Sequence, residues 1–408
     1  MSFDAGRSAA RRGTTLAAAM LGLGSQSMST MLLSYVLTTL IAEFGLSGAA
    51  GGLISTVTNI GMLIGGIIFG TLADRCGRTR VFAATVALFS LATGLGAISS
   101  SVNMLYLFRF LVGVGAGGEY GVVMSMIADA YSREQRGRIT SYVTVSGQIG
   151  SIIAAIAAAL IVPVLGWRGL FAFGALPVLL AIWARFALRE GDAWKRAIGT
   201  AEGRPSIRDL FSRGRATTTI RLTIMATAQV AGYFGLMNWL PAILQGRLNL
   251  SVSGSSLWMI ATITGMSIGM IVFGQIMDRL GAKVAYGLFL IASAIAVFAY
   301  SFAGSAAVML IGGALVGFFC NGMNAGYGAI VGNLYPVEIR ATANNTIFNI
   351  GRAVGGFSSV VIGFLLESFS LRAAMAFLAI MYIISLFCVL TLNMTKAKTG
   401  SSTEQELS

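Results

Sequence analysis

The chain has 408 residues, of which 56% are hydrophobic and 11% are charged. Soluble domains carry roughly 25% charged residues, so this composition excludes an ordinary soluble enzyme and predicts a membrane protein. The formal net charge of +13 would suit nucleic acid, but the basic residues are spread over short segments between apolar runs. We therefore expect no nucleic-acid partner.

A polar segment with three arginines, residues 1–14, precedes the first apolar run and has no small-residue cleavage site. It is predicted to be a cytoplasmic N-terminus, and the run that follows is predicted to be a retained span. Crossing about 30 Å of hydrocarbon takes roughly 20 helical residues. Six runs of this length follow, near residues 15–41, 50–72, 80–99, 103–127, 139–162 and 168–189.

The next stretch, residues 190–216, is polar and basic and is predicted to be a cytoplasmic linker with a short surface helix. Six more apolar runs follow it, so the chain is predicted to be all-α, with one six-helix half at 15–189, a second at 217–393 and a polar cytoplasmic tail at 394–408. The runs of the second half cover residues 217–240, 255–277, 284–303, 307–331, 342–365 and 372–393.

The positions of the basic residues predict the orientation of these spans. Of the 28 Lys and Arg residues, 23 lie on the side that holds both termini and the linker. The opposite side holds only Arg168, Arg247 and Arg372, and two arginines lie inside spans. By the positive-inside rule, both termini are expected in the cytoplasm, with the chain embedded in the lipid bilayer of the cell (inner) membrane.

An internal repeat relates the two halves at a constant offset of 204 residues. At this offset Leu111 to Gly113 fall on Leu315 to Gly317, and Gly118 falls on Gly322. Two parallel halves related by an axis along the membrane normal are an architecture of alternating-access transporters, with the substrate site between the halves near the midplane. Ionisable residues at the predicted cytoplasmic turns recur at this offset of 204 residues, except Arg78, which has no ionisable equivalent. They are Asp74, Arg75, Arg78, Asp278, Arg279, Glu134, Arg136, Glu338 and Arg340.

The segment 70–80, GTLADRCGRTR, resembles the signature of the major facilitator superfamily between its second and third helices, and 274–283 is a degraded copy. The resemblance covers essentially the whole chain and implies the major facilitator fold, with twelve transmembrane helices in two six-helix halves. We expect the ionisable residues of these turns to act in gating, capping helix ends or pairing across the interface between the halves. The alternative is that charge bias alone retains the basic residues there.

Two further segments narrow the resemblance. The string GGEYG at 117–121 resembles the fourth helix of organic-anion and metabolite proton symporters. The segment 340–352 resembles the start of the eleventh helix in their sialate, lactate and aromatic-acid groups. Unlike the aromatic-acid group, the first apolar run has no Asp or Arg, which argues against an aromatic substrate.

Glu119 is the one carboxylate inside a predicted span, and the chain has no histidine. Burial disfavours the charged form of a carboxylate and so suits it to proton exchange. We therefore expect Glu119 to carry the proton, with Arg109 of the same helix taking part in proton coupling. The alternative is a structural ion pair of Glu119 with Arg109 or with a residue of another helix.

Arg352 lies about ten residues into its span, roughly 15 Å at 1.5 Å per residue, near the bilayer midplane. A guanidinium binds carboxylates through two parallel hydrogen bonds, so Arg352 is the leading candidate for substrate binding. The alternative is a structural role in which it bonds to backbone carbonyls. Amide and hydroxyl groups of other spans complete the predicted substrate site: Tyr327, Asn349, Gln148, Asn324, Tyr35, Tyr233 and Asn345.

These observations predict a secondary active transporter that carries a small organic anion in symport with protons, and that performs no enzymatic reaction. We expect no metal site or other cofactor, since the three cysteines form no ligand pattern, and we expect the monomer to be functional. A proton-coupled exporter of a drug or metabolite is the alternative, and a membrane receptor without transport is a third possibility.

Overall fold

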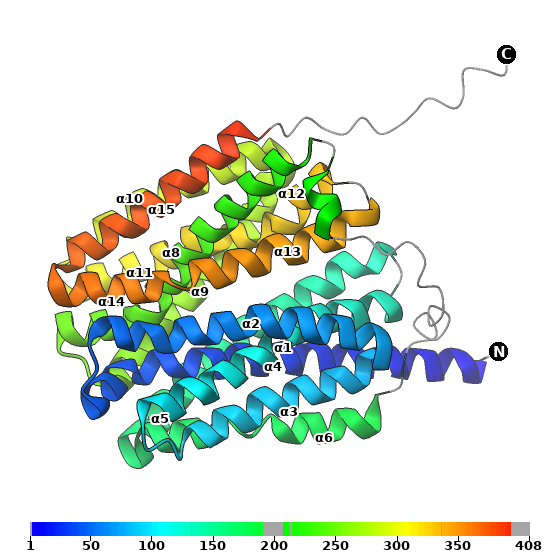
Figure 1. Cartoon of the computed structure of the whole chain (residues 1–408), viewed down its shortest axis with the longest axis horizontal. Coiled ribbons are helices and arrows are strands. Elements are labelled where there is room, and N and C mark those ends of the chain that lie inside the picture. Colours follow the sequence, from blue (N-terminus) through cyan, green and yellow to red (C-terminus); the bar gives the residue numbers. More distant parts are fainter. Residues whose placement is uncertain are drawn as a thin grey trace.

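The computed structural model describes residues 2–131, 133–188, 190, 207–212, 214–335 and 337–392, and every regular element in this part of the chain is helical. The helices run along the long axis of the molecule (Figure 1). Apolar runs form helices because hydrocarbon offers no partner for backbone polar groups. The first half comprises α1 (Ser2–Phe44), α2 (Gly48–Cys76), α3 (Arg78–Gly96), α4 (Val102–Ala130), α5 (Arg133–Phe173) and α6 (Val178–Ala187).

The second half begins after the 3₁₀ turn η1 (Ile207–Phe211). Most of the predicted linker and the tail after residue 393 lie outside the described residues. The predicted polar N-terminal segment forms the beginning of α1, which starts at Ser2. The helices of the second half are α8 (Ala216–Leu248), α9 (Val252–Leu280), α10 (Ala282–Tyr300), α11 (Ala306–Gly322), η2 (Met323–Gly326), α12 (Tyr327–Leu334), α13 (Val337–Gly355), α14 (Ser358–Ser368) and α15 (Leu371–Thr391).

Nine helical segments of the described chain are long and apolar enough to cross a bilayer, and structural reasons account for the rest of the twelve predicted. The segment 139–187 holds two passes, because the chain turns at Gly166 with φ 64° and ψ −170°. The 33-residue α8 is long enough to cross a bilayer, but its many polar side chains lower its mean hydropathy. The apolar helix α11 has only 17 residues before η2 interrupts it.

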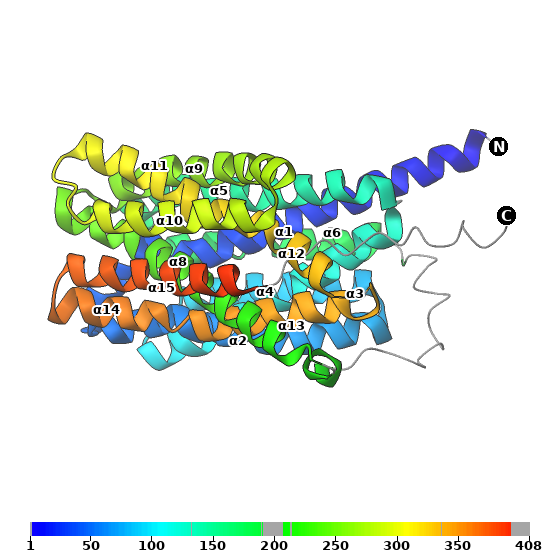
Figure 2. The ribbon, with the colours of Figure 1, turned by 90° about the horizontal axis from the view of Figure 1, so that it is seen from above.

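The start of α1 and the end of α15 lie toward the same end of the bundle, which we call the terminal end (Figures 1 and 2). Its turns show the repeat: Gly77 and Gly281, 204 residues apart, have φ of 106° and 86°. Each donates its N–H to a carbonyl four residues earlier, on Ala73 or Met277. Glycine adopts positive φ readily because it has no Cβ.

Serine caps show the same repeat at the opposite end, which we call the far end. Ser47 caps α2 and Ser251 caps α9, with hydroxyl oxygens 3.2 and 3.0 Å from backbone nitrogens. Ser101 and Ser305 cap α4 and α11 in the same way. These side chains satisfy N–H groups that the first helical turn leaves unpaired.

Two predicted spans are broken in the structure. The run 307–331 is interrupted by η2, and 342–365 divides into α13 and α14 after Gly355. The hydroxyl of Tyr286 donates to the carbonyl of Met323 at 2.8 Å, so a protein group serves the irregular backbone of η2. Such breaks are tolerated at membrane depth only where protein or water supplies the missing hydrogen bonds.

Glycines bring helices into backbone contact at repeated positions in both halves. A Cβ on Gly65 of α2 would collide with Val114 of α4, and one on Gly269 of α9 would collide with Phe318 of α11. Gly113 packs on Thr58 in the same way. Small residues suit these interfaces because helices in lipid associate by close packing rather than by a hydrophobic effect.

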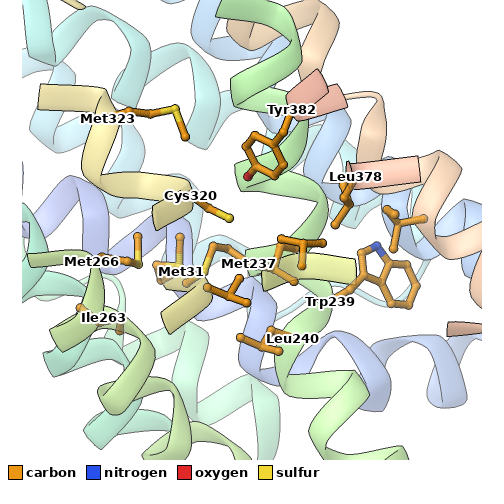
Figure 3. Close-up of a cluster of buried hydrophobic side chains, with 14 of the residues drawn as sticks. Met31, Met237, Trp239, Leu240, Ile263, Met266, Cys320, Met323, Leu378 and Tyr382 are labelled. Atoms are coloured by element: carbon orange, nitrogen blue, oxygen red, sulfur yellow. The ribbon is translucent and has the colours of Figure 1, made fainter. Parts of the chain in front are cut away.

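The larger apolar cluster joins the two halves (Figure 3). Met31 of α1 belongs to it together with Met237 of α8 and Met266 of α9. The chain thus forms one packed body at this level rather than two separate bundles.

We predict that Gly65→Ala and Gly269→Ala each destabilise the protein, because the added methyl meets backbone of the partner helix. Overpacking of this kind costs about 1–3 kcal/mol. Thermal unfolding of the purified protein in detergent measures the effect. Gly70→Ala and Gly274→Ala are matched controls on the same two helices, also 204 residues apart, where nothing lies within 4 Å of the added carbon. Equal melting temperatures for all four variants would contradict the prediction.

Candidate functional site

The two halves are joined at the far end by a buried amide. Asn238 of α8 donates to the hydroxyls of Ser55 on α2 and Ser359 on α14, and accepts from Ser34 on α1. All four residues are at most 5% exposed. Ser34 and Asn238 are 204 residues apart and therefore meet as repeat equivalents. This node ties four helices together with neutral groups.

Two more contacts extend this closure. Thr38 of α1 donates to Gln245 of α8 at 2.6 Å. The Thr56 hydroxyl of α2 donates to the Gly356 carbonyl at 2.9 Å. We use "far-end latch" for these contacts together with the Asn238 node. It joins the halves at the end away from the chain termini.

Arg352 lies in the last turn of α13, where the negative end of the helix dipole favours a cation. Its guanidinium carbon is 4.8 Å from the ring centre of Phe348, and its Nη1 is 3.5 Å from the sulfur of Met62 on α2. Tyr120 of α4 and Tyr233 of α8 lie close enough to interact with its charge. Among the described residues no carboxylate pairs with it, and its Nε has no partner. A half-buried cation thus lies between the halves, surrounded by aromatic groups.

Three other predicted residues lie near the groups that surround Arg352 or on its own helix. Tyr327 is buried behind Phe348, with ring centres 5.9 Å apart, and its hydroxyl has no partner among the described residues. Asn349 faces α2 at Gly66, where an added Cβ would lie 3.1 Å from its amide nitrogen. Tyr35 is fully buried beside Tyr233 and donates to a carbonyl of α5 at 3.4 Å.

The remaining predicted substrate residues are not brought into this group. Gln148 is half-buried on α5, and no contact joins it to Arg352 among the described residues. Asn324 hydrogen-bonds Asn321 at the break between α11 and α12. The side chain of Asn345 lies outside the described part of the structure.

Sequence reasoning missed Tyr120 and Met62. Tyr120 follows Glu119 directly and is 37% exposed. Its place in the GGEYG string, directly after the buried carboxylate, is the signal that the sequence offers for it. Met62 carried no signal, because a methionine in an apolar run has the same composition whether it faces lipid or a ligand.

Glu119 faces a different region from Arg352. It is fully buried, and its carboxylate oxygens have no hydrogen-bond partner among the described residues. It lies against Gly22 of α1 and Phe82 of α3, inside the first half. Glu119 and Arg352 are therefore not in contact in this conformation, and Glu119 does not compete directly with a substrate for Arg352.

Arg109 is also buried, at 2% exposure, but has partners. Its terminal nitrogens donate to the carbonyls of Ser29 and Thr30 on α1, each at 3.3 Å. The ion pair with Glu119 considered from the sequence is absent from the described residues. Arg109 instead fastens α1 to α4 through the main chain.

Among the described side chains, no ion pair joins a predicted gating residue of one half to the other half. Arg78 forms an ion pair with Asp129 of α4 and donates to the Ser125 carbonyl at 3.0 Å, so its predicted pairing across the interface is not found. Arg75, Asp278 and Arg279 are exposed. Outside the described part of the structure lie the side chains of Asp74, Glu134, Arg136, Glu338 and Arg340.

Glu190, to which the sequence assigned no role, caps α3. Its carboxylate accepts from the backbone nitrogens of Arg78 at 2.9 Å and Thr79 at 3.1 Å, and from the Thr79 hydroxyl at 2.5 Å. An anion at a helix N-terminus is favoured by the unpaired N–H groups and the helix dipole. The end of the first half is thereby tied to the turn between α2 and α3.

We predict that Glu190→Ala lowers the stability of the protein by about 1 kcal/mol, the typical cost of losing a helix cap. Glu190→Gln keeps an acceptor oxygen and should lose less. Melting temperatures of the two variants in detergent measure the difference. If Glu190→Gln proved the more damaging variant, the cap would not be what Glu190 contributes.

An all-helical membrane body, with a half-buried cation between two packed halves, defines a secondary transporter by its architecture. The model of the Major Facilitator Superfamily matches residues 19–266 and 222–407. The chain belongs to this superfamily, and it is an integral membrane transporter of a small metabolite, not an enzyme. The predicted fold is confirmed.

Several relatives are similar along most of their length. A Haemophilus influenzae protein, named provisionally for metabolite transport, is 38% identical over 91% of this chain and 93% of its own. The cis,cis-muconate transport protein of Acinetobacter baylyi is 30% identical over 90% of each chain. The sialic acid transporter of Escherichia coli is 28% identical over 85% of each.

Solved structures share the fold. A bacterial homologue of the human lysosomal transporter Spinster, inward-facing and occupied, matches with a TM-score of 0.78 at 18% identity, over 93% of this chain and 96% of that one. The xylose transporter of E. coli matches with a TM-score of 0.77 at 16% identity, over 94% and 99%.

Proposed function

We propose that this transporter carries a small organic anion together with one or more protons by alternating access. The observation that carries the proposal is the position of Arg352 between the halves, without a carboxylate partner among the described residues. An unpaired cation away from bulk water is costly. A substrate carboxylate would supply the missing charge.

The surroundings of Arg352 suit such a ligand. Phe348 covers one face of the guanidinium, which leaves the donors at its edge for a planar acceptor. The hydroxyls of Tyr120 and Tyr233 lie near the same charge and could donate to the bound oxygens. We propose Arg352, Tyr120, Tyr233, Tyr35 and Asn349 as the substrate site. Tyr327 supports Phe348 from behind.

The relatives support an acid as the substrate. The muconate and sialic acid transporters named above carry carboxylic acids, and each matches this chain over at least 85% of its length. The proposal extends this chemistry to the present chain without choosing one acid. The Arg352 environment holds a single positive charge among the described residues, which favours one carboxylate at the centre.

Glu119 is the proposed proton carrier, and Arg109 the residue that holds α1 beside it. Both termini are proposed to be cytoplasmic, in the inner membrane, with halves at 15–189 and 217–393 and a functional monomer. With this orientation the far-end latch closes the external side. Export of a metabolite in exchange for protons would use the same fold, so the direction of flux decides between the two.

We predict that Arg352→Lys weakens binding of the acid by about 2–5 kcal/mol, the range for disrupting a buried charge pair, and that Arg352→Ala abolishes it. A lysine lacks the planar fork that matches a carboxylate. Binding is measured by the thermal shift of the purified protein across mono- and dicarboxylates, sugar acids and aromatic acids. Arg372→Lys, at a stacked arginine near the far end, is the control. Unchanged affinity in a folded Arg352→Ala protein would refute the anion site.

We predict that Glu119→Gln abolishes uphill uptake of the acid driven by a proton gradient in proteoliposomes. The amide keeps the shape of the side chain but cannot titrate. Exchange of labelled for unlabelled acid, which needs no net proton movement, should survive and serves as the control. Retained accumulation under a pH gradient would place the proton site elsewhere. Gradient-driven loss of the acid from loaded vesicles with the opposite polarity would support the exporter.

A further inference from the structure

The carboxyl of Glu119 packs against Gly22 of the neighbouring helix α1 and near the ring of Phe82 on α3. We call this packing position, formed by Gly22 and Phe82, the Glu119 seat. A Cβ built on Gly22 of α1 would collide with Oε1 of Glu119 and would also crowd the ring of Phe82. Gly22 is buried, and Glu119 has no exposed surface. The absence of a side chain at position 22 is therefore what allows α1 and α4 to close over the carboxyl.

Among the described residues nothing compensates a charge on Glu119 at this position. Neither of its carboxylate oxygens has a hydrogen-bond or ion-pair partner there. An ionised carboxylate without partner or water is strongly disfavoured, so the closed seat accepts the neutral acid. The charged groups on the described parts of the helices around it have no contact with its carboxylate: Arg12 and Glu43 on α1, Arg75 on α2, Arg78 and Arg80 on α3, and Arg109 and Asp129 on α4.

A second contact joins α1 to α4, farther along α1 from Gly22. Ser29 lies seven residues, or two turns, beyond Gly22, and its carbonyl accepts from Arg109 at 3.3 Å. The Thr30 carbonyl accepts from the same guanidinium. The position of α1 on α4 therefore depends on two contacts. Arg109, which stays charged, forms one of them, and Glu119, which can gain or lose a proton, forms the other.

The next turns of α1 face the second half. Ser34 donates to Asn238 at 3.2 Å, and Thr38 donates to Gln245 at 2.6 Å, both on α8. Met31 lies in the apolar cluster with Met237 of α8 (Figure 3). One continuous helix thus contacts the Glu119 seat through one segment and the far-end latch through another.

We propose that α1 is the element that couples the proton to the closure of the far end, with Gly22 as the positioning residue. When Glu119 is neutral, α1 seats on α4 at Gly22, and Ser34 and Thr38 reach α8. When Glu119 ionises, the carboxylate must gain water, α1 leaves the seat, and the latch on α8 opens. The assignment of Glu119 as the transported proton's carrier rests on the proposed function, but the linkage between α1 and the latch does not.

Linkage makes the coupling reciprocal: if protonation favours the latch, then weakening the latch must weaken proton binding by the same factor. Raising the pH should therefore open the far end. Asn238→Ala should move the transition to lower pH.

The test is the distance between spin labels on the two halves at the far end, measured from pH 5 to pH 9 in the full chain without substrate. Labels at Ser100 and Gly304 are on exposed turns, and Cys76→Ser removes the exposed native thiol. We expect a short distance at low pH and a longer one at high pH in the otherwise unchanged chain. In Glu119→Gln the short distance should persist at every pH.

Gly22→Ala is the second variant. Its methyl competes with the carboxyl for the seat, so the transition should move down by about one pH unit or more, within the roughly 5- to 150-fold range of coupling between sites. Gly13→Ala is the matched control on the same helix, since nothing lies within 4 Å of its added carbon. Asn238→Ala should shift the transition in the same direction as Gly22→Ala.

A pH-dependent distance that survives in Glu119→Gln would overturn the proposal, as would equal transitions in Gly22→Ala and Gly13→Ala. A distance that does not change with pH in the parent chain would overturn it as well. Failure of the proposed function looks different: the distance would respond to pH through Glu119, while proteoliposomes showed no proton-driven uptake of any acid. The two outcomes are therefore distinguishable.

Discussion

The scarcity of hydrogen-bond partners in hydrocarbon is the constraint on which this structure depends. Each polar group placed there must find a partner in the protein, or a ligand or proton must supply what is missing. Arg109 donates from its two terminal nitrogens to backbone carbonyls, and only its Nε has no partner among the described residues. Arg352 and Glu119 have no ionic partner among the described residues, one as a cation between the halves and the other as an acid inside one half. The proposed substrate and proton sites follow from this difference.

Glycines bring backbones together both within the halves and between them, where Gly52 of α2 packs on the Ser359 backbone of α14, and the far end adds hydrogen bonds. Inside the halves, glycines such as Gly65 and Gly269 bring backbones together without polar groups that could exchange partners. Between the halves at the far end, hydroxyls and amides around Asn238 make neutral hydrogen bonds. A neutral hydrogen bond contributes only about 0.5–1.5 kcal/mol net, so such a latch can open at modest cost. Hydrogen bonds that can be exchanged at such a cost suit an interface between halves that rock between two states.

The proposed proton and substrate sites are on different faces of α4. Glu119 faces α1 and α3, whereas Tyr120, the next residue, lies near Arg352. Coupling between the two ligands therefore has to pass through helix positions rather than through direct exchange of one charge. The first helix is suited to this, because its Tyr35 also lies beside Tyr233 in the substrate region.

The sequence by itself determined the spans, the repeat at 204 residues and the identity of the ionisable groups inside the membrane, because hydropathy and spacing are local properties of the chain. Even the caps at Ser47 and Ser251 obey that repeat. Only the tertiary structure decided which way those groups face. Successive helical residues point about 100° apart, so helix packing sends Glu119 toward Gly22 and Tyr120 toward Arg352. The same packing places Asp129 of α4 beside Arg78. Which residue pairs with a charge depends on which helices meet, and this cannot be read from the spacing of residues along one helix.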